Sequence, residues 1–161
     1  MILGMSLSTF TLVHVLISLI GIASGIVVLF GMLRSKWMPG WTMLFLVTTV
    51  LTSATGFLFP FSKLLPSHIV GIISLVVLAI ALLALYVFHL AGAWRWVYVV
   101  TAVTALWFNC FVGVVQAFQK VWILHPLAPT GSEPPFAIAQ GVLLVVFLVL
   151  GFLAVRRFRP V

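Results

Sequence analysis

The sequence predicts an all-α, multi-pass membrane protein, and three observations support this class. Of the 161 residues, 65% are hydrophobic and only 6% are charged, and the mean hydropathy is +1.39. Glu133 is the single acidic residue beside eight Lys and Arg, whereas a soluble surface mixes both signs over roughly a quarter of its residues. Five apolar segments each reach the length of ~20 residues that is needed to cross a bilayer of ~30 Å. We therefore expect one transmembrane helical domain over residues 1–161.

Each predicted span is bounded by residues that stop a helix. The first has no positive residue before it and an apolar run too long for a cleaved signal sequence, so we expect it to be retained. The second follows Pro39-Gly40, and the third follows Pro66. Gly92 and Arg95 separate the third from the fourth, and a proline-rich connection precedes the fifth. To within ~3 residues, the five spans are expected at about 8–33, 41–61, 68–91, 96–119 and 136–155.

The distribution of cations predicts the orientation. With five spans, the odd-numbered connections and the C-terminal tail share one side of the membrane. Six cations fall on that side and two, Lys63 and Lys120, on the other, and cytoplasmic loops are the ones enriched in Lys and Arg. We therefore expect the N-terminus outside and the C-terminus in the cytoplasm. The cytoplasmic boundary would hold Trp37, Trp41, Trp94 and Trp96 with Arg34, Lys36, Arg95, Arg156, Arg157 and Arg159.

The same patterns argue against several functions. The membrane explains nearly every cation, so the net charge of +7 does not indicate a nucleic-acid partner. The middle of each predicted span lacks Asp, Glu, Lys and Arg, whereas ion-driven transporters place ionisable groups there. The sequence contains no paired carboxylates, Ser-His-Asp set, H-E-x-x-H sequence or phosphate-binding loop. Cys110 is alone and so forms no internal disulfide. We therefore expect a protein that is not an enzyme.

Small and polar residues inside the spans indicate the faces that turn inward. His14, Ser18, Gly21 and Gly25 follow the i, i+4, i+7, i+11 spacing of one helical face. Gly21 and Gly25 form a G-x-x-x-G sequence, which lets a second helix approach closely. Such faces serve either as interhelical contacts or as the lining of a pocket, and the sequence leaves both open. Further residues expected at helix contacts are Gly56, Gly71, Asn109 and Gly113.

Polar side chains concentrate at the outer ends of the predicted spans. At 1.5 Å per residue, His14 lies ~30 Å and His68 ~33 Å from the cytoplasmic ends of their helices. These positions suit two kinds of ligand. One is a b-type haem with His14 and His68 as axial ligands, and the other is a hydrogen-bonded quinone or lipid-like molecule. No other metal site is expected. The candidate ligand-binding residues are His14, Thr55, His68, Gln116, Lys120, Glu133 and Gln140.

Glu133 lies in the longest connection, which is rigid because it holds four of the eight prolines. Thr130 or Ser132 is expected to cap the fifth helix, with Pro134 and Pro135 in its first turn. Glu133 would then stand at the positive end of that helix dipole, where an anion is stabilised. The alternative is a lid over an outward-facing ligand site. The sequence leaves open whether Glu133 is only part of a helix cap or a functional residue.

Three segments resemble those of short multi-pass inner-membrane proteins of proteobacteria that have no assigned activity. They are TTVLTSATGFLFP at residues 48–60, PSHIVGIISL at 66–75 and LAPTGSEPPF at 127–136. The resemblance covers most of the chain, and the last segment is the most distinctive. It implies a multi-pass protein of the bacterial inner membrane and brings no site residues or cofactor with it.

These expectations lead to one functional hypothesis and one alternative. The hypothesis is a small non-catalytic inner-membrane protein that assembles with or supports a larger membrane complex, or self-associates, and has an outer-leaflet ligand pocket. Its glycine and threonine faces would make the contacts. The alternative is a redox-associated membrane protein that binds a quinone, a lipid-like molecule or a b-type haem through its outer-face histidines.

Overall fold

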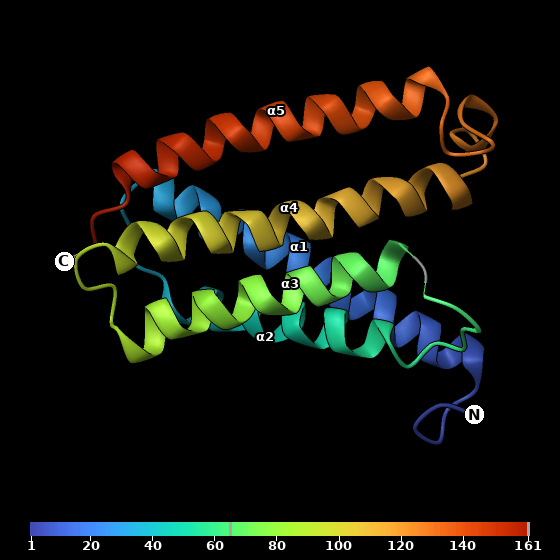
Figure 1. The fold of residues 1–161 in the computed structure, drawn as a ribbon, viewed down its shortest axis with the longest axis horizontal. Coiled ribbons are helices and arrows are strands. Elements are labelled where there is room, and N and C mark those ends of the chain that lie inside the picture. The colour runs from blue at the N-terminus through green and yellow to red at the C-terminus, as the bar shows by residue number, and fades with distance from the viewer. Residues whose placement is uncertain (65, 161) are drawn as a thin grey trace.

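The computed structural model describes residues 1–64 and 66–160, and every regular element in these ranges is helical. Two short segments, the π-helix η1 (Leu83–Val87) and the 3-10 helix η2 (His125–Leu127), accompany five α-helices. The predicted all-α class is therefore confirmed. The α-helices are α1 (Leu7–Leu33), α2 (Pro39–Gly56), α3 (Pro66–Leu82), α4 (Trp94–Lys120) and α5 (Pro134–Arg157) (Figure 1).

The helices run antiparallel to their chain neighbours and form one elongated bundle (Figure 1). α1 packs along α2, α2 along α3 and α3 along α4, and α1 also contacts α4, which closes a four-helix unit. α5 lies outside this unit, against α4 and α1. Because the bundle has five antiparallel helices, the two termini lie at opposite ends (Figure 1).

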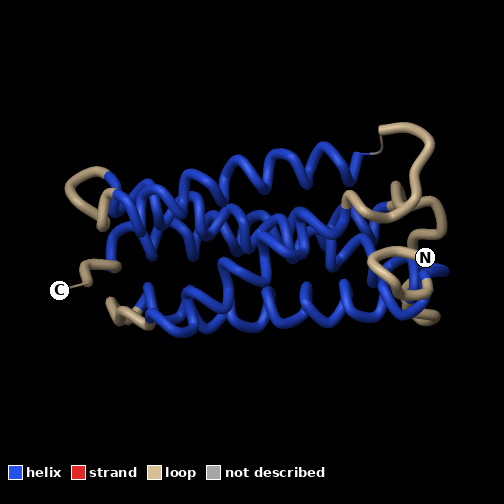
Figure 2. Tube along the Cα trace, turned by 90° about the horizontal axis from the view of Figure 1, so that it is seen from below, coloured by secondary structure: helices blue, strands red, loops and turns tan. Residues whose placement is uncertain are grey.

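The connections between helices fall into two groups, one at each end of the bundle (Figure 2). We call the first the Glu133 end; it holds residues 1–6, 57–64 and 121–133. We call the second the arginine end; it holds residues 34–38, 88–93 and 158–160. Six of the eight Lys and Arg lie in or directly beside the connections of the arginine end. The positive charge is therefore concentrated at one end of the bundle.

Four of the described helices are long and apolar enough to cross a membrane: Leu7–Leu33, His68–Val87, Trp94–Lys120 and Pro134–Arg157. α2 has 18 residues, six of which are Ser or Thr. It measures ~27 Å at 1.5 Å per residue, and its hydroxyls lower its hydropathy. The remaining predicted span, 41–61, overlaps α2, which is not among these four helices.

Two helices end earlier than the sequence predicts. α2 ends at Gly56 rather than at residue 61, because Pro60 lacks an N–H and its ring clashes with the carbonyl four residues before it. α3 gives way to η1, which ends at residue 87 rather than 91. Directly afterwards His89 and Leu90 adopt φ values of 49° and 59°, and left-handed residues cannot continue a right-handed helix.

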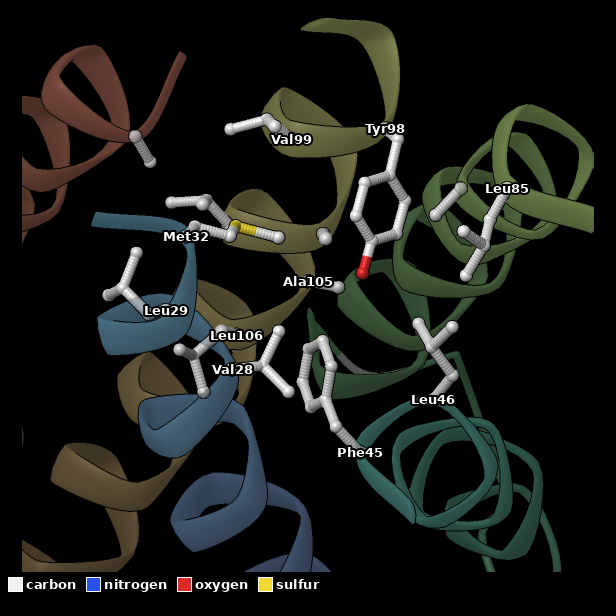
Figure 3. Packing of buried hydrophobic residues seen from close by; sticks show 14 of the residues in the cluster. Val28, Leu29, Met32, Phe45, Leu46, Leu85, Tyr98, Val99, Ala105 and Leu106 are labelled. Carbon is white, nitrogen blue, oxygen red and sulfur yellow. The ribbon is translucent and has the colours of Figure 1, made fainter. Parts of the chain in front are cut away.

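The hydrophobic core lies in the half of the bundle next to the arginine end. Side chains from α1, α2, α4 and η1 meet there, and Figure 3 shows Phe45 and Tyr98 turned toward the same centre. Tyr98 is 0% exposed and Phe45 is 1% exposed. Among the α5 residues, all of which the structure describes, Ala154 alone is buried. The core is therefore built by the four-helix unit, and α5 touches it mainly at its C-terminal end.

Gly25 marks a very close approach of α1 to α2 and α4. A Cβ at this position would lie 2.5 Å from Leu106 Cδ1 and 2.8 Å from carbons of the Phe45 ring. One turn earlier, a Cβ on Gly21 would lie 3.3 Å from the hydroxyl oxygens of Thr48 and Thr49. The missing side chains on this face of α1 thus set the distance between the helices.

We expect Gly25→Ala to destabilise the bundle by ~1–3 kcal/mol, because the added methyl group overpacks the contact of α1 with α2 and α4. Gly141→Ala is the matched control, since a Cβ there meets nothing within 4 Å. Replacing an exposed helical Gly by Ala stabilises by ~0.5–1 kcal/mol. The two variants should therefore shift Tm in opposite directions in the same detergent. A Gly25→Ala protein as stable as the wild type would contradict the close packing.

Candidate functional site

Antiparallel packing gathers the candidate ligand residues at one end of the bundle. The N-termini of α1, α3 and α5 and the C-termini of α2 and α4 all lie at the Glu133 end (Figure 1). The seven side chains proposed from the sequence therefore share this part of the molecule. They form three groups: one around His14, one around His68, and one along the α4–α5 contact with the connection that joins these helices.

His14 contacts α2 and the connection that follows it. Its Nδ1 lies 2.7 Å from Thr55 Oγ1, and its ring meets the Phe59 ring edge-on at 5.1 Å between centroids. The Thr55 hydroxyl donates its proton to the Leu51 carbonyl oxygen, 2.6 Å away. Because a hydroxyl has only one proton, His14 Nδ1 donates to Thr55, and Nε2 is left as an acceptor. Lys120 of α4 lies within Coulombic range of this ring.

His68 lies in different aromatic surroundings near the start of α3. It is 6% exposed, and its ring centroid is 4.1 Å from that of Phe61 and 5.6 Å from that of Phe57. A Cβ on Gly71 would lie 3.1 Å from the Phe57 ring, so glycine lets this ring pack against α3. The two histidines proposed as a haem ligand pair thus contact different phenylalanines.

The remaining candidates on α4 and α5 differ in their exposure. Gln116 and Lys120, one turn apart on α4, are both exposed. Gln140 instead joins α5 to α4, because its Nε2 donates to the Phe111 carbonyl oxygen at 3.1 Å. Its Oε1 is buried and accepts no hydrogen bond from the described residues. Gln116 and Lys120, like the neighbouring Gln119, are therefore polar side chains of α4 that a molecule outside the bundle can reach.

Glu133 is itself the N-cap residue of α5, so the predicted cap at Thr130 or Ser132 is wrong. Its carboxylate turns back toward these two residues. Oε1 accepts from the Thr130 N–H at 3.0 Å and the Thr130 hydroxyl at 2.7 Å, and Oε2 accepts from the Ser132 N–H at 3.1 Å. These donors lower the Glu133 pKa from 4.5 to about 2, and the Thr130 hydroxyl has the largest effect. The carboxylate thus holds the turn that leads into α5.

A polar contact lies midway along the bundle, where α1, α2 and α4 meet. Asn109 Nδ2 donates to Thr49 Oγ1 at 3.1 Å, directly beside Gly21. Thr49 is 0% exposed, and hydrogen bonds between transmembrane helices contribute ~0.6 kcal/mol on average. This group therefore acts in helix packing.

The other predicted packing positions differ in what they contact. The Ser18 hydroxyl donates to the Val15 carbonyl oxygen of its own helix at 2.7 Å. A Cβ on Gly56 would lie 3.9 Å from His14 Cε1, and one on Gly113 would lie 3.6 Å from Ile22 Cδ1. Both distances are ordinary van der Waals contacts, so these two glycines permit a methyl group where Gly25 does not.

Arg95 has a structural role that the sequence did not indicate. Its guanidinium donates to the carbonyl oxygens of Val155 at 2.8 Å and Phe158 at 2.7 Å. The last carbonyls of a helix lack partners within the helix, and a cation is favoured at this negative end of the dipole. Arg95 therefore caps the C-terminus of α5. No local pattern reveals this contact, because its partners are 60 and 63 residues away.

The chain has no match among the known proteins with which it was compared: no protein-family model, curated protein or solved structure matches it. Within residues 1–64 and 66–160, no group of three or more His, Cys, Asp or Glu is placed to hold a metal ion. The fold and the site alone therefore define the class: an all-helical bundle, with four helices able to cross a membrane, that is polar at the Glu133 end and cationic at the arginine end.

We expect Glu133→Gln to lower Tm at pH 7, because the neutral amide loses the charge that the Thr130 and Ser132 donors stabilise. Folding lowers the pKa of the Glu133 carboxyl group. The ionised carboxylate therefore contributes fully to the stability of the folded state above pH 4.5, and this contribution is lost as the pH falls toward about 2. The Tm difference between variant and wild type should shrink over that interval. Thermal unfolding of the detergent-solubilised protein at several pH values measures it. A pH-independent difference would show that the charge is irrelevant.

Proposed function

We propose that this chain is a small, non-catalytic protein of the bacterial inner membrane that assembles with a larger membrane complex through α5. We assign it five spans, because α2 packs along α1 and α3 within the bundle. The cations at the arginine end favour a cytoplasmic location for that end, with the N-terminus outside. The resemblance of three sequence segments to proteobacterial inner-membrane proteins supports this compartment.

The observation that carries the proposal is an exposed apolar face on α5 that begins with a glycine. Gly141, Val145, Leu148 and Phe152 follow the i, i+4, i+7, i+11 spacing of one helical face. The last three are 60%, 63% and 61% exposed, and a Cβ on Gly141 would meet nothing within 4 Å. Small residues let a second transmembrane helix approach closely. This face therefore suits the helix of a partner protein.

The small-residue face of α1 packs against other helices of the bundle and is not available to a partner. This leaves α5 as the candidate contact surface. Gly25 of α1 is closed by Phe45 and Leu106, and Gly21 is covered by Thr48 and Thr49. The glycine and threonine faces that suggested assembly in the sequence thus hold the four-helix unit together. A partner would bind the apolar face of α5, which this unit leaves uncovered.

The test is the size of the complex in native membranes. The tagged 17.6 kDa chain is crosslinked in the membrane, extracted in mild detergent and separated by native electrophoresis. We expect a species larger than the monomer, and we expect Gly141→Leu to convert most of it to monomer by blocking helix approach. A wild-type protein that runs only as a monomer after crosslinking would refute the proposal.

Val146→Leu is the matched control for Gly141→Leu. Val146 lies on the same helix and is 44% exposed, but it is five residues beyond Gly141 and so faces another direction. We expect this variant to keep the large species. Equal loss in both variants would indicate a general effect of larger side chains on α5 rather than a specific contact.

A quinone site at His14 is the second candidate function, and the hydrogen bonds of this residue favour it. Thr55 Oγ1 accepts the hydrogen bond of Nδ1–H, so Nε2 can accept a hydrogen bond from a quinol hydroxyl. Lys120, an exposed residue at the same end of the bundle, carries an ammonium group that can donate to a quinone carbonyl oxygen. His14 would thus supply the acceptor and Lys120 the donor for a quinone head group.

We expect purified wild-type protein to carry quinone in a solvent extract and His14→Ala protein to lose most of it. His125→Ala is the control, because His125 is an exposed imidazole at the same end. Chromatography of the extracts measures the quinone content, and the visible spectrum of the same sample reports any haem. A colourless wild-type sample without quinone would exclude the redox alternative.

A further inference from the structure

A cavity of about 350 Å³ lies at the arginine end, beside the C-terminus of α1. Its volume falls within the ~300–1,000 Å³ typical of small-molecule sites. It shares no residue with the α5 face or with the His14 site. Its lining residues are Val27, Phe30, Gly31, Arg34, Lys36 and Met38.

The chain that follows α1 folds back to form this cavity. Ser35 adopts a φ of 53°, and the Lys36 N–H donates to the Gly31 carbonyl oxygen at 2.8 Å. A Cβ on Gly31 would lie 2.6 Å from Met38 Cε, so glycine leaves room for the returning side chain. The cavity is therefore bounded by α1 on one side and by the α1–α2 connection on the other.

The lining combines apolar surface with two cations. Phe30 and Met38 supply apolar surface, and the exposed Arg34 and Lys36 supply positive charge. The only acidic residue, Glu133, lies at the opposite end of the bundle and so cannot neutralise them. Two full charges outweigh the partial negative charge of about half an elementary unit at the C-terminus of α1. The cavity surface is thus mainly apolar with two cations among its lining residues, a combination that suits a molecule with an anionic head and an apolar tail.

Two tryptophans indicate the depth of this cavity in the membrane. Trp37 and Trp41, on the same connection and the first turn of α2, are 40% and 48% exposed, and exposed Trp is enriched at the level of the lipid head groups. We propose that the cavity binds one anionic phospholipid, with its phosphate on Arg34 and Lys36 and the start of an acyl chain against Phe30. Basic pockets at the cytoplasmic ends of transmembrane helices bind such head groups.

Native mass spectrometry of the purified full chain in detergent tests this proposal, with phosphatidylglycerol as the probe and phosphatidylcholine as the reference. We expect one phosphatidylglycerol to bind more tightly than phosphatidylcholine. Arg34→Gln combined with Lys36→Gln should weaken this binding by about 25-fold, since each cation near the head groups contributes about fivefold. Equal affinity of the wild type for both lipids would overturn the proposal.

Arg156→Gln combined with Arg157→Gln is the charge-matched control, because neither residue lines the cavity although both lie near the same end. We expect it to bind phosphatidylglycerol as the wild type does. An equal loss in this variant would mean diffuse surface attraction and would overturn the proposal.

Val27→Phe tests the apolar part of the site. It keeps the charge but fills the cavity, so it should also weaken phosphatidylglycerol binding, with Tm as the check on folding. Inorganic phosphate should bind far more weakly than the lipid, and phosphate binding of equal strength would refute a lipid site. If Val27→Phe does not fold, the double variant of the exposed residues Arg34 and Lys36 still tests the proposal.

Discussion

Polar groups inside the helical bundle need hydrogen-bond partners within the protein, and this constraint shapes the contacts between helices. Asn109 of α4 donates to Thr49 of α2, and Ser53 of α2 donates to Ser74 of α3 at 3.2 Å. The other threonines of α2 bond mostly to carbonyls of their own helix. Charged side chains lie at the two ends instead. Small and polar side chains thus join neighbouring helices at these contacts, beside the large apolar side chains of the core.

The two halves of the bundle do different work because their side chains differ. Large apolar residues such as Phe45 and Tyr98 fill the half next to the arginine end and hold α1 to α4 together. The half next to the Glu133 end holds histidine, hydroxyl and amide groups that form specific hydrogen bonds.

α5 is held to the four-helix unit mainly along one side. Its opposite side is free of this unit, and this free side is the candidate contact surface. Gln140 bonds to α4 near one end, Arg95 caps the other end, and Ala154 with Phe158 enters the core. Between these points the outward face of α5 is apolar, and Val145, Leu148 and Phe152 are each at least 60% exposed. The phospholipid cavity lies beside α1 and uses different residues, so assembly through α5 and lipid binding can be tested separately.

Composition and local spacing alone determined the all-helical membrane class, because apolar length and charge depletion are properties of each segment by itself. The same spacing placed Gly21 and Gly25 on one face of the first helix. Only the tertiary structure decided which groups meet. Arg95 finds its carbonyl partners 60 and 63 residues away, and the Glu133 carboxylate turns back to Thr130 rather than toward α5. The Arg95 contact depends on how α4 and α5 pack, which no local pattern encodes, and the Glu133 contact depends on how the connection before α5 turns.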